Sequence, residues 1–278
     1  MSLRKLYYTL PPSWRLLARK LYYLPIDTYE TLAGKRHQYE PRKGDIYIGS
    51  GDFLAQGQHQ LQLLKRYANL QSTDHVLDIG SGIGRTAVPL TTYLNHTGTY
   101  DGFDVVEKGV RWCQSTIGRD YPNFRFQYVP LNNDLYNTAS QKAAEFTFPY
   151  ADNQFDVSFL FSVFTHMKRD EIDHYLGEIA RTLRPGGRCL ATFFLYNDHN
   201  EEQIATQAHF NFPAAYDGYR LMDPKVEGAN IALAEKTLDA MLAEKSLRIQ
   251  QTVHGYWKNA NGKTGDNSYQ DVVILERV

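Results

Sequence analysis

The stretch that decides the fold of this chain is Val76-Leu77-Asp78-Ile79-Gly80-Ser81-Gly82-Ile83-Gly84-Arg85. An apolar run reaches an acidic residue, and three glycines then follow at alternate positions. A helical pattern comes next, with apolar residues at steps of four, three and four: Ile83, Ala87, Leu90 and Leu94. Glycine permits the positive φ angles of a tight turn and lets a ligand approach the main chain. The stretch therefore predicts a strand, a tight turn and a helix that open onto a bound ligand.

The spacing of the glycines separates two classes of nucleotide cofactor. The dinucleotide-binding fingerprint has glycine at its first, third and sixth positions. Here the sixth position is Arg85, and the third glycine is Gly84. This shorter spacing behind Asp78 resembles the first motif of class I S-adenosylmethionine-dependent methyltransferases of the small-molecule type. The resemblance implies S-adenosylmethionine as the cofactor.

Three later features agree with this resemblance. Asp104 lies at the end of the second predicted strand, where a carboxylate can accept hydrogen bonds from both ribose hydroxyls. An aromatic-Pro loop, a strand and the loop Ser162-Val163-Phe164-Thr165-His166-Met167 resemble the family's fourth motif. The stretch Leu183-Arg184-Pro185-Gly186-Gly187 predicts a helix end ahead of the fifth strand. The resemblance covers approximately residues 49–278.

The order of the predicted elements gives the fold class. Five strands alternate with helices, and two further strands read as a closing hairpin of 247–257 and 269–275. This order predicts an α/β fold with a Rossmann-like, seven-stranded, mostly parallel sheet and helices on both faces. The resemblance to the methyltransferases implies that the last strand is antiparallel. The predicted strands after the first are 100–105, 124–129, 157–161 and 188–195, with a helix at 169–183 after the fourth and another that contains Leu233, Leu238, Met241 and Leu242.

The chain divides into an extension and a catalytic domain. We expect residues 1–48 to form a basic, aromatic-rich N-terminal extension, and the resemblance implies a methyltransferase domain at residues 49–278. Within that domain, 197–232 lacks strong periodicity and is interpreted as a lid insertion after the fifth strand.

Charge is distributed unevenly along the chain. Residues 1–46 hold nine Lys and Arg against four Asp and Glu, a formal charge of +5, which leaves −6 for the remainder of a chain of net charge −1. One interpretation is a helical arm, broken at Pro11, Pro12 and Pro25, that packs on the body. The other is a basic amphipathic segment on an anionic membrane surface. A basic front end on an acidic body argues against nucleic acid as a partner of the core.

Other classes of protein are excluded by what the sequence lacks. No apolar run reaches about eighteen residues, so no spanning helix is expected. The N-terminus lacks the features of a secretory signal, so we expect a cytoplasmic location. The two cysteines, Cys113 and Cys189, support neither a disulfide scaffold nor a zinc site, and we predict no metal. The oligomeric state stays open.

The cofactor is expected at the carboxyl ends of the parallel strands. Pro130 stands where the resembling family often has an acidic residue, so adenine recognition is assigned to the two residues that follow it. The resemblance also implies a pocket-closing role for a Gly-Asp-Phe segment, which could equally be a plain helix start. The candidate cofactor-binding residues are Asp78, Gly80, Ser81, Gly82, Gly84, Asp104, Val105, Leu131, Asn132, Ser162, Gly51 and Phe53.

One residue is the candidate catalyst. If the methyl acceptor is a hydroxyl, a base must take its proton as the new bond forms. His166 follows the fourth strand, and an unperturbed pKa near 6.5 suits that role. The alternative is that His166 caps the next helix. Arg85 is either an anchor for an acidic acceptor or a solvated residue at a helix start.

The leading hypothesis is therefore a methyltransferase that acts on a small molecule through a hydroxyl oxygen. A nicotinamide-dependent oxidoreductase is the first alternative, which Arg85 at the sixth fingerprint position disfavours. A non-catalytic adenosyl-binding protein at a membrane surface is the second. The sequence leaves the acceptor itself open.

Overall fold

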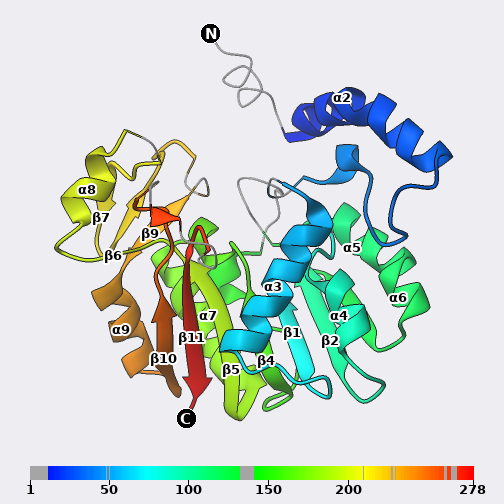
Figure 1. Ribbon diagram of the computed structural model, residues 1–278. Helices are drawn as coiled ribbons and strands as arrows, with labels where there is room; N and C mark the ends of the chain where they lie inside the picture. The colour runs from blue at the N-terminus through cyan, green and yellow to red at the C-terminus, as the bar shows by residue number, and fades with distance from the viewer. Residues whose placement is uncertain are drawn as a thin grey trace.

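The computed structural model describes residues 12–47, 49, 51–131, 141–208, 210–226, 228, 230–259, 262–263 and 268–278 (Figure 1). The α-helices are α2 (Pro12–Leu32), α3 (Phe53–Tyr67), α4 (Ala87–Tyr93), α5 (Glu107–Ser115), α6 (Ile117–Asp120), α7 (Arg169–Thr182), α8 (Glu201–Thr206) and α9 (Glu235–Ala243). The strands are β1 (His75–Ile79), β2 (Thr99–Asp104), β3 (Phe124–Tyr128), β4 (Phe155–Leu160), β5 (Leu183–Phe193), β6 (Leu195–Tyr196), β7 (Ala214–Tyr216), β8 (Tyr219–Leu221), β9 (Ile231–Ala234), β10 (Leu247–Val253) and β11 (Asp271–Arg277). Three short 3₁₀ helices are η1 (Lys43–Asp45), η2 (Ala143–Glu145) and η3 (Phe164–His166).

The central sheet has seven strands in the order β10-β11-β5-β4-β1-β2-β3. Neighbouring strands from β5 to β3 pair in parallel, whereas β11 is antiparallel to both β5 and β10. The chain moves outward from β1 to β3 and then returns to β4 on the other side of β1. Ligands bind at such switch points, beyond the carboxyl ends of the strands. The predicted fold class and the antiparallel last strand are confirmed.

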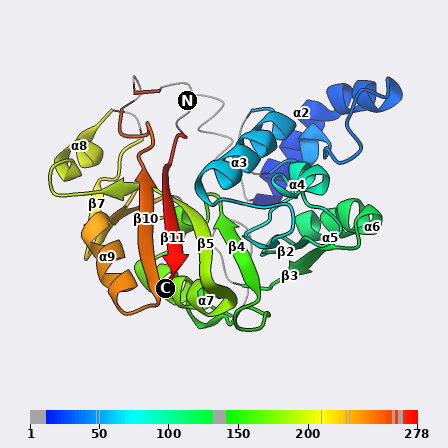
Figure 2. The same ribbon diagram turned by 60° about the horizontal axis from the view of Figure 1, so that its bottom comes forward.

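Strand β1 is buried on both faces. Val76 belongs to one hydrophobic core, and Leu77 and Ile79 belong to the other. Helices α3, α4, α5 and α6 supply the first core, while α7 and α9 supply the second, so helices cover both faces of the sheet (Figure 2). Burial on both faces explains why β1 is an almost continuous apolar run.

The helix after the glycine turn is shorter than the sequence pattern suggests. Residues 80–86 form the turn, and α4 begins only at Ala87. Pro89 therefore lies in the first helical turn, where its missing N–H removes no intrahelical hydrogen bond. The predicted apolar stripe is nevertheless buried, because the turn packs its Ile83 on the same core as α4.

A second, four-stranded sheet in the order β6-β9-β8-β7 follows β5. Strands β7 and β8 lie within the segment interpreted as an insertion, and β6 and β9 lie at its two ends. The expected helix containing Leu233 is partly wrong, because Leu233 lies in β9 and α9 begins at Glu235. All four residues of β9 are buried between β6 and β8, and a short run of consecutive buried residues fits a strand better than a one-sided helix.

Helix α2 continues through Pro25, so the expected break at Pro25 is wrong. A proline inside a helix deprives one carbonyl of its partner. Pro25 and Leu21, the residue four positions earlier, are both exposed, so that carbonyl can be solvated instead. Pro11 lies outside the described residues. After α2 the chain packs on the body through buried Tyr39 and Ile46.

Candidate active site

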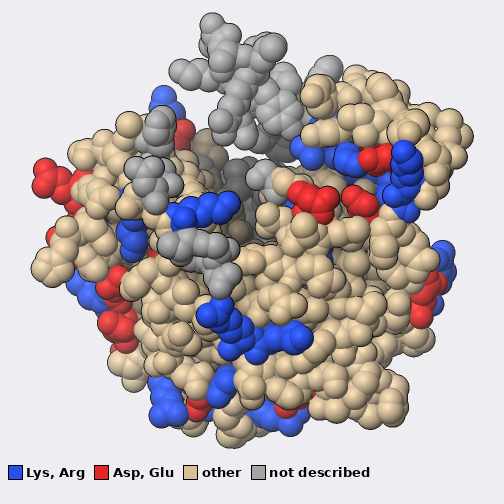
Figure 3. Space-filling view, viewed as in Figure 1, with Lys and Arg blue, Asp and Glu red and all other residues tan. Residues whose placement is uncertain are grey.

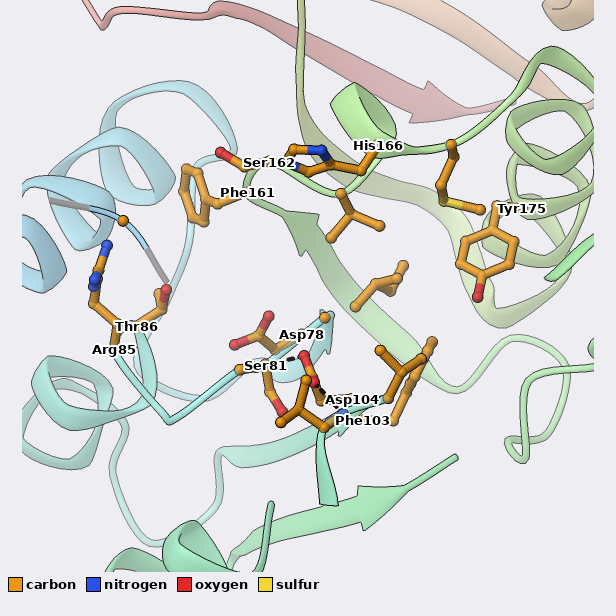
Figure 4. A pocket seen from close by; sticks show the side chains of 18 of the residues that line it. Asp78, Ser81, Arg85, Thr86, Phe103, Asp104, Phe161, Ser162, His166 and Tyr175 are labelled. Carbon is orange, nitrogen blue, oxygen red and sulfur yellow. Dashed lines mark hydrogen bonds between the residues drawn. The ribbon is translucent and has the colours of Figure 1, made fainter. Parts of the chain in front are cut away.

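A cavity of about 350 Å³ lies at the carboxyl ends of β1, β2 and β4 (Figure 4). This is the switch point of the sheet, so its position agrees with the expectation for a bound ligand. The candidate base His166 also lines the cavity. The candidate cofactor residues in its wall are Asp78, Gly80, Ser81, Gly82, Asp104, Val105, Leu131 and Ser162.

The glycine turn is held tightly between two neighbouring segments. The backbone N–H groups of Gly80 and Ser81 both donate to the carbonyl of Phe103, each at 2.9 Å. Gly80 has a φ of +83°, and a Cβ at this position would lie 2.5 Å from Cγ2 of Val163. Only glycine fits there, because both the backbone angle and the space exclude a side chain.

Asp104 is anchored by backbone donors on both sides. Its Oδ2 accepts from the N–H of Gly82 at 2.8 Å, and its Oδ1 accepts from the N–H of Val106 at 2.7 Å. Burial raises the pKa of Asp104 to about 6, although these backbone hydrogen bonds act in the opposite direction. Each carboxylate oxygen has a further lone pair, so the fixed group can still accept hydrogen bonds from a ligand.

Two further polar groups lie on the same side of the cavity. Burial raises the pKa of Asp78 to about 8, and its Oδ2 accepts from the hydroxyl of Tyr100 at 2.6 Å. The hydroxyl of Ser81 is buried and has no hydrogen-bond partner among the described residues. An unsatisfied buried hydroxyl costs about 1–3 kcal/mol. This wall therefore fits a polar ligand that would satisfy Ser81.

The opposite wall is formed by the loop after β4 (Figure 4). The N–H of Ser162 donates to Oγ1 of Thr192 at 2.7 Å, and its hydroxyl donates to Oε1 of Gln270 at 2.9 Å. The Nδ1 of His166 lies 2.7 Å from the carbonyl oxygen of Gly228. A carbonyl can only accept, so Nδ1 carries the hydrogen, and in the neutral ring Nε2 is then the basic nitrogen.

Comparison with known proteins indicates a family for the middle part of the chain. Residues 77–191, which include the glycine turn, Asp104 and His166, match the family described as "Methyltransferase domain". The match covers this segment, which is less than half of the chain, and indicates a methyltransferase; the fold is that of S-adenosylmethionine-dependent methyltransferases. The match supports the expected cofactor, S-adenosylmethionine, and disfavours the oxidoreductase alternative.

Solved structures share the fold of this methyltransferase at low sequence identity. A methyltransferase from Methanosarcina mazei is 20% identical, with a TM-score of 0.53 over 78% of this chain and 97% of that one. The PH0226 protein from Pyrococcus horikoshii is 14% identical, with a TM-score of 0.54 over 84% and 94%. Geranyl diphosphate C-methyltransferase from Streptomyces coelicolor, in complex with Mg²⁺, geranyl diphosphate and S-adenosyl-L-homocysteine, is 14% identical, with a TM-score of 0.51 over 80% of each chain.

Helix α7 contributes wall residues that the sequence reasoning missed. Met167, just before the helix, and Glu171 and Tyr175 within it follow at steps of four and line one side of the cavity. Oε2 of Glu171 accepts from the N–H of Lys168 at 2.8 Å. The spacing of these three residues, which places one carboxylate between two largely apolar side chains on one side of a helix, could have identified them from the sequence. Tyr47, Gln60 and Gln270 were also missed, and no local motif marks them.

Four candidate cofactor residues are not among the described wall residues. Asn132 lies outside the described residues. Gly84 lies behind the turn, where a Cβ would approach Sγ of Cys113 to 2.9 Å. Phe53 is buried in the core, and Gly51 precedes the capping residue of α3. Cofactor contact by these residues stays a prediction.

Arg85 of the methyltransferase is partly buried and lines the cavity, so the interpretation of a solvated arginine is wrong. Its guanidinium lies over the ring of Phe53, 5.5 Å from the centroid. Burial lowers the pKa of this guanidinium below its usual value. A Cβ on Gly49 would lie 2.3 Å from its Nη1, so glycine at that position leaves room for the arginine.

The described part of the chain shows neither a bilayer-spanning helix nor a cluster of metal-ligating side chains. No helix in it is both long enough and apolar enough to cross a bilayer. Within the same residues, no cluster of three or more His, Cys, Asp or Glu side chains could hold a metal ion.

Proposed function

We propose that this methyltransferase methylates a hydroxyl oxygen of a small, partly apolar molecule, with His166 as the general base. The observation that carries the proposal is the hydrogen bond between Nδ1 of His166 and the carbonyl of Gly228, at 2.7 Å. It orients the ring in the cavity wall and assigns the basic lone pair to Nε2. The same bond would strengthen as the ring gains a proton.

The composition of the wall near His166 supports an acceptor with an apolar part. Val163, Met167 and the ring of Tyr175 contribute apolar surface there, and Glu171 contributes a polar group. The neighbour from Streptomyces coelicolor is described with geranyl diphosphate, which is also a small molecule with an apolar chain. That neighbour is a C-methyltransferase, so methylation of carbon is the main competing outcome.

The proton must move in step with methyl transfer. When bound, S-adenosylmethionine supplies an electrophilic methyl group on a positively charged sulfur. We infer that Nε2 of His166 takes the proton of the acceptor hydroxyl as the oxygen–carbon bond forms and the carbon–sulfur bond breaks, its electron pair going to sulfur. The products are the methyl ether, S-adenosylhomocysteine and a protonated His166, which returns its proton to water.

The segment 197–232 is proposed to act as a lid over the acceptor. Gly228 belongs to this segment, and its carbonyl contacts His166 from 62 residues further along the chain. A lid that orients the base would couple acceptor binding to catalysis. We also propose a cytoplasmic location, which the two free, buried cysteines support.

The test is the variant His166→Gln, which keeps a polar side chain but removes the basic nitrogen. Methyl transfer from radiolabelled S-adenosylmethionine is measured on a panel of small apolar alcohols and phenols. We expect kcat to fall by roughly 10²–10⁴-fold while the affinity for the cofactor, measured by calorimetry, stays unchanged. In the wild type the rate should decrease at low pH because protonated His166 cannot accept a proton, and this decrease should be absent in the variant.

His174→Gln is the matched control. The Nε2 of His174 also lies close to a backbone carbonyl, that of Phe146 at 2.9 Å, but His174 is not among the wall residues. Its replacement should leave kcat near the wild-type value. An unchanged kcat in His166→Gln, or a product methylated on carbon or nitrogen, would contradict the proposal.

A further inference from the structure

Helix α2 turns its charged side toward the protein. Asp27 is only 6% exposed, and its carboxylate accepts from the N–H groups of Lys43 at 2.7 Å and Gly44 at 3.0 Å. Arg36 approaches the same carboxylate to 3.6 Å, and Glu30 forms an ion pair with Lys43. These contacts fix which face of the helix is directed inward.

The opposite face of α2 is apolar and exposed. Leu17, Leu21 and Leu24 follow at steps of four and three, so they share one side of the helix. In Figure 3 the outer surface of α2 is mainly tan, while charged side chains gather where the helix meets the body. Seven of the twelve exposed large hydrophobic side chains in the described residues lie on α2: Leu17, Leu21, Tyr22, Leu24, Ile26, Tyr29 and Leu32.

This arrangement is the reverse of an ordinary surface helix, which buries its apolar side. A contiguous exposed apolar surface of this kind marks an interaction site. The contacts of Asp27 and Glu30 hold the helix in this orientation. The apolar face is therefore kept exposed to solvent by the fold itself.

The charges around α2 decide between two classes of partner. Residues 1–46 carry a formal charge of +5, and exposed Lys20, Lys35 and Arg42 lie on or next to the helix. A second copy of the chain would bring the same positive segment against itself, which is unfavourable. An anionic bilayer attracts such a segment and accepts leucine side chains at its interface, with tyrosines at the level of the headgroups.

We propose that the outer face of α2 docks on the surface of an anionic lipid bilayer. In Figure 1 the helix lies at the edge of the sheet where the parallel strands end, which is the edge that holds the cavity. The chain runs from α2 to Tyr47 and Gly49, both of which line the cavity. Docking through α2 therefore turns the edge that carries the active site toward the bilayer.

The experiment uses the full chain and sucrose-loaded vesicles, either of phosphatidylcholine alone or with added phosphatidylserine. The wild-type protein should sediment with the anionic vesicles, less so as salt is raised, and weakly with the neutral ones. The variant Leu17→Ser/Leu21→Ser/Leu24→Ser should lower the partition coefficient by about a hundredfold. The single variant Leu21→Ser should give an intermediate loss.

A triple variant of other exposed apolar residues, Val226→Ser/Ile249→Ser/Val278→Ser, is the matched control and should bind vesicles as the wild type does. Cofactor affinity should be unchanged in both triple variants, so the docking test and the test of the active-site proposal give independent results. The docking proposal is overturned if the wild type stays in the supernatant of anionic vesicles, or if the leucine variants bind undiminished. It is also overturned if light scattering shows a dimer that the leucine variant converts to a monomer.

Discussion

The two ends of the active-site cavity are built in different ways. The end at β1 and β2 is made by backbone amides and buried carboxyl groups, and its hydrogen bonds join residues 78–106. The end near His166 is made by side chains that are tied to distant segments. His166 contacts Gly228, 62 positions away, and Ser162 contacts Gln270, 108 positions away.

This difference suggests that one end of the cavity is set by the fold of the central sheet and that the other end depends on more distant segments. The end at β1 and β2, where we propose that the cofactor binds, is determined by a strand, a turn and the next strand; we call it the cofactor end. The end near His166, where we propose that the acceptor binds, depends on how the second sheet and the hairpin of β10 and β11 pack against the loop after β4; we call it the acceptor end. We expect replacements at the first end to change cofactor binding and replacements at the second end to change acceptor use.

The largest expected effect concerns the buried carboxyl groups at the cofactor end. Burial raises the pKa of Asp78 to about 8, above its value in the unfolded chain. Between about pH 4 and pH 8 the folded protein then holds a proton that the unfolded chain has lost. The contribution of Asp78 to the stability of the cofactor-free protein should therefore fall as pH rises through this window, by about 1.4 kcal/mol per pH unit. Asp104, with its pKa raised to about 6, should add a loss of the same sign between about pH 4 and pH 6.

Denaturant titrations at several pH values check this slope. Asp78→Asn is nearly isosteric, keeps an acceptor for the hydroxyl of Tyr100, and cannot ionise. The difference in free energy of unfolding between variant and wild type should grow in favour of the variant as pH rises from about 4 to 8. If the free energy of unfolding had the same pH dependence in both proteins, the pKa of Asp78 would not be raised, and its carboxyl group would be more exposed to solvent than the structure indicates.

The second effect in size is on cofactor affinity. Asp104→Ala removes the acceptor for the N–H groups of Gly82 and Val106 and the group expected to bind the ribose. Affinity for S-adenosylmethionine, measured by calorimetry, should fall by at least about tenfold, since hydrogen bonds to a charged group contribute about 1.5–3 kcal/mol each.

Asp101→Asn is the control on the same strand. Asp101 is also buried, but it pairs with Arg125 through both carboxylate oxygens and is not among the cavity wall residues. Its replacement should reduce stability without a comparable loss of cofactor affinity. If Asp104→Ala retained normal affinity, the ribose assignment would be wrong, and the two ends of the cavity would no longer differ as described.

The sequence indicated which residues gather at the cofactor end because the geometry there is local. Glycines that need positive φ angles and a carboxylate at the next strand end leave a pattern within about thirty residues. The acceptor end left only fragments of a pattern. His166 was found through its place after the fourth strand, but its partner Gly228 was not, since nothing local connects the two.

The fold was predicted for a similar reason. Alternating strands and helices restrict the topology to few arrangements, so a mostly parallel sheet with helices on both faces followed from the order of the elements. Errors arose where tertiary context overrode local signals. Pro25 does not end α2, because the carbonyl group that it leaves without a partner is exposed to solvent. Leu233 lies in a strand because β6 and β8 pair on either side of β9.

The smallest expected effects compare the two ends directly through Ser81→Ala and Met167→Ala. The hydroxyl of Ser81 lacks a partner in the described structure, so its removal should leave the free energy of unfolding unchanged or slightly raised. Cofactor affinity should nevertheless fall by about threefold to tenfold, because a hydrogen bond to the ligand is lost. Met167→Ala should have the opposite profile, with a higher acceptor KM at normal cofactor affinity and some loss of stability from the cavity left behind. Calorimetry, denaturant titration and steady-state kinetics on both variants measure all three quantities. Ser81→Ala could instead destabilise the protein and bind the cofactor normally. The hydroxyl of Ser81 would then stabilise the fold and not bind the ligand, and the two ends of the cavity would not differ at this residue.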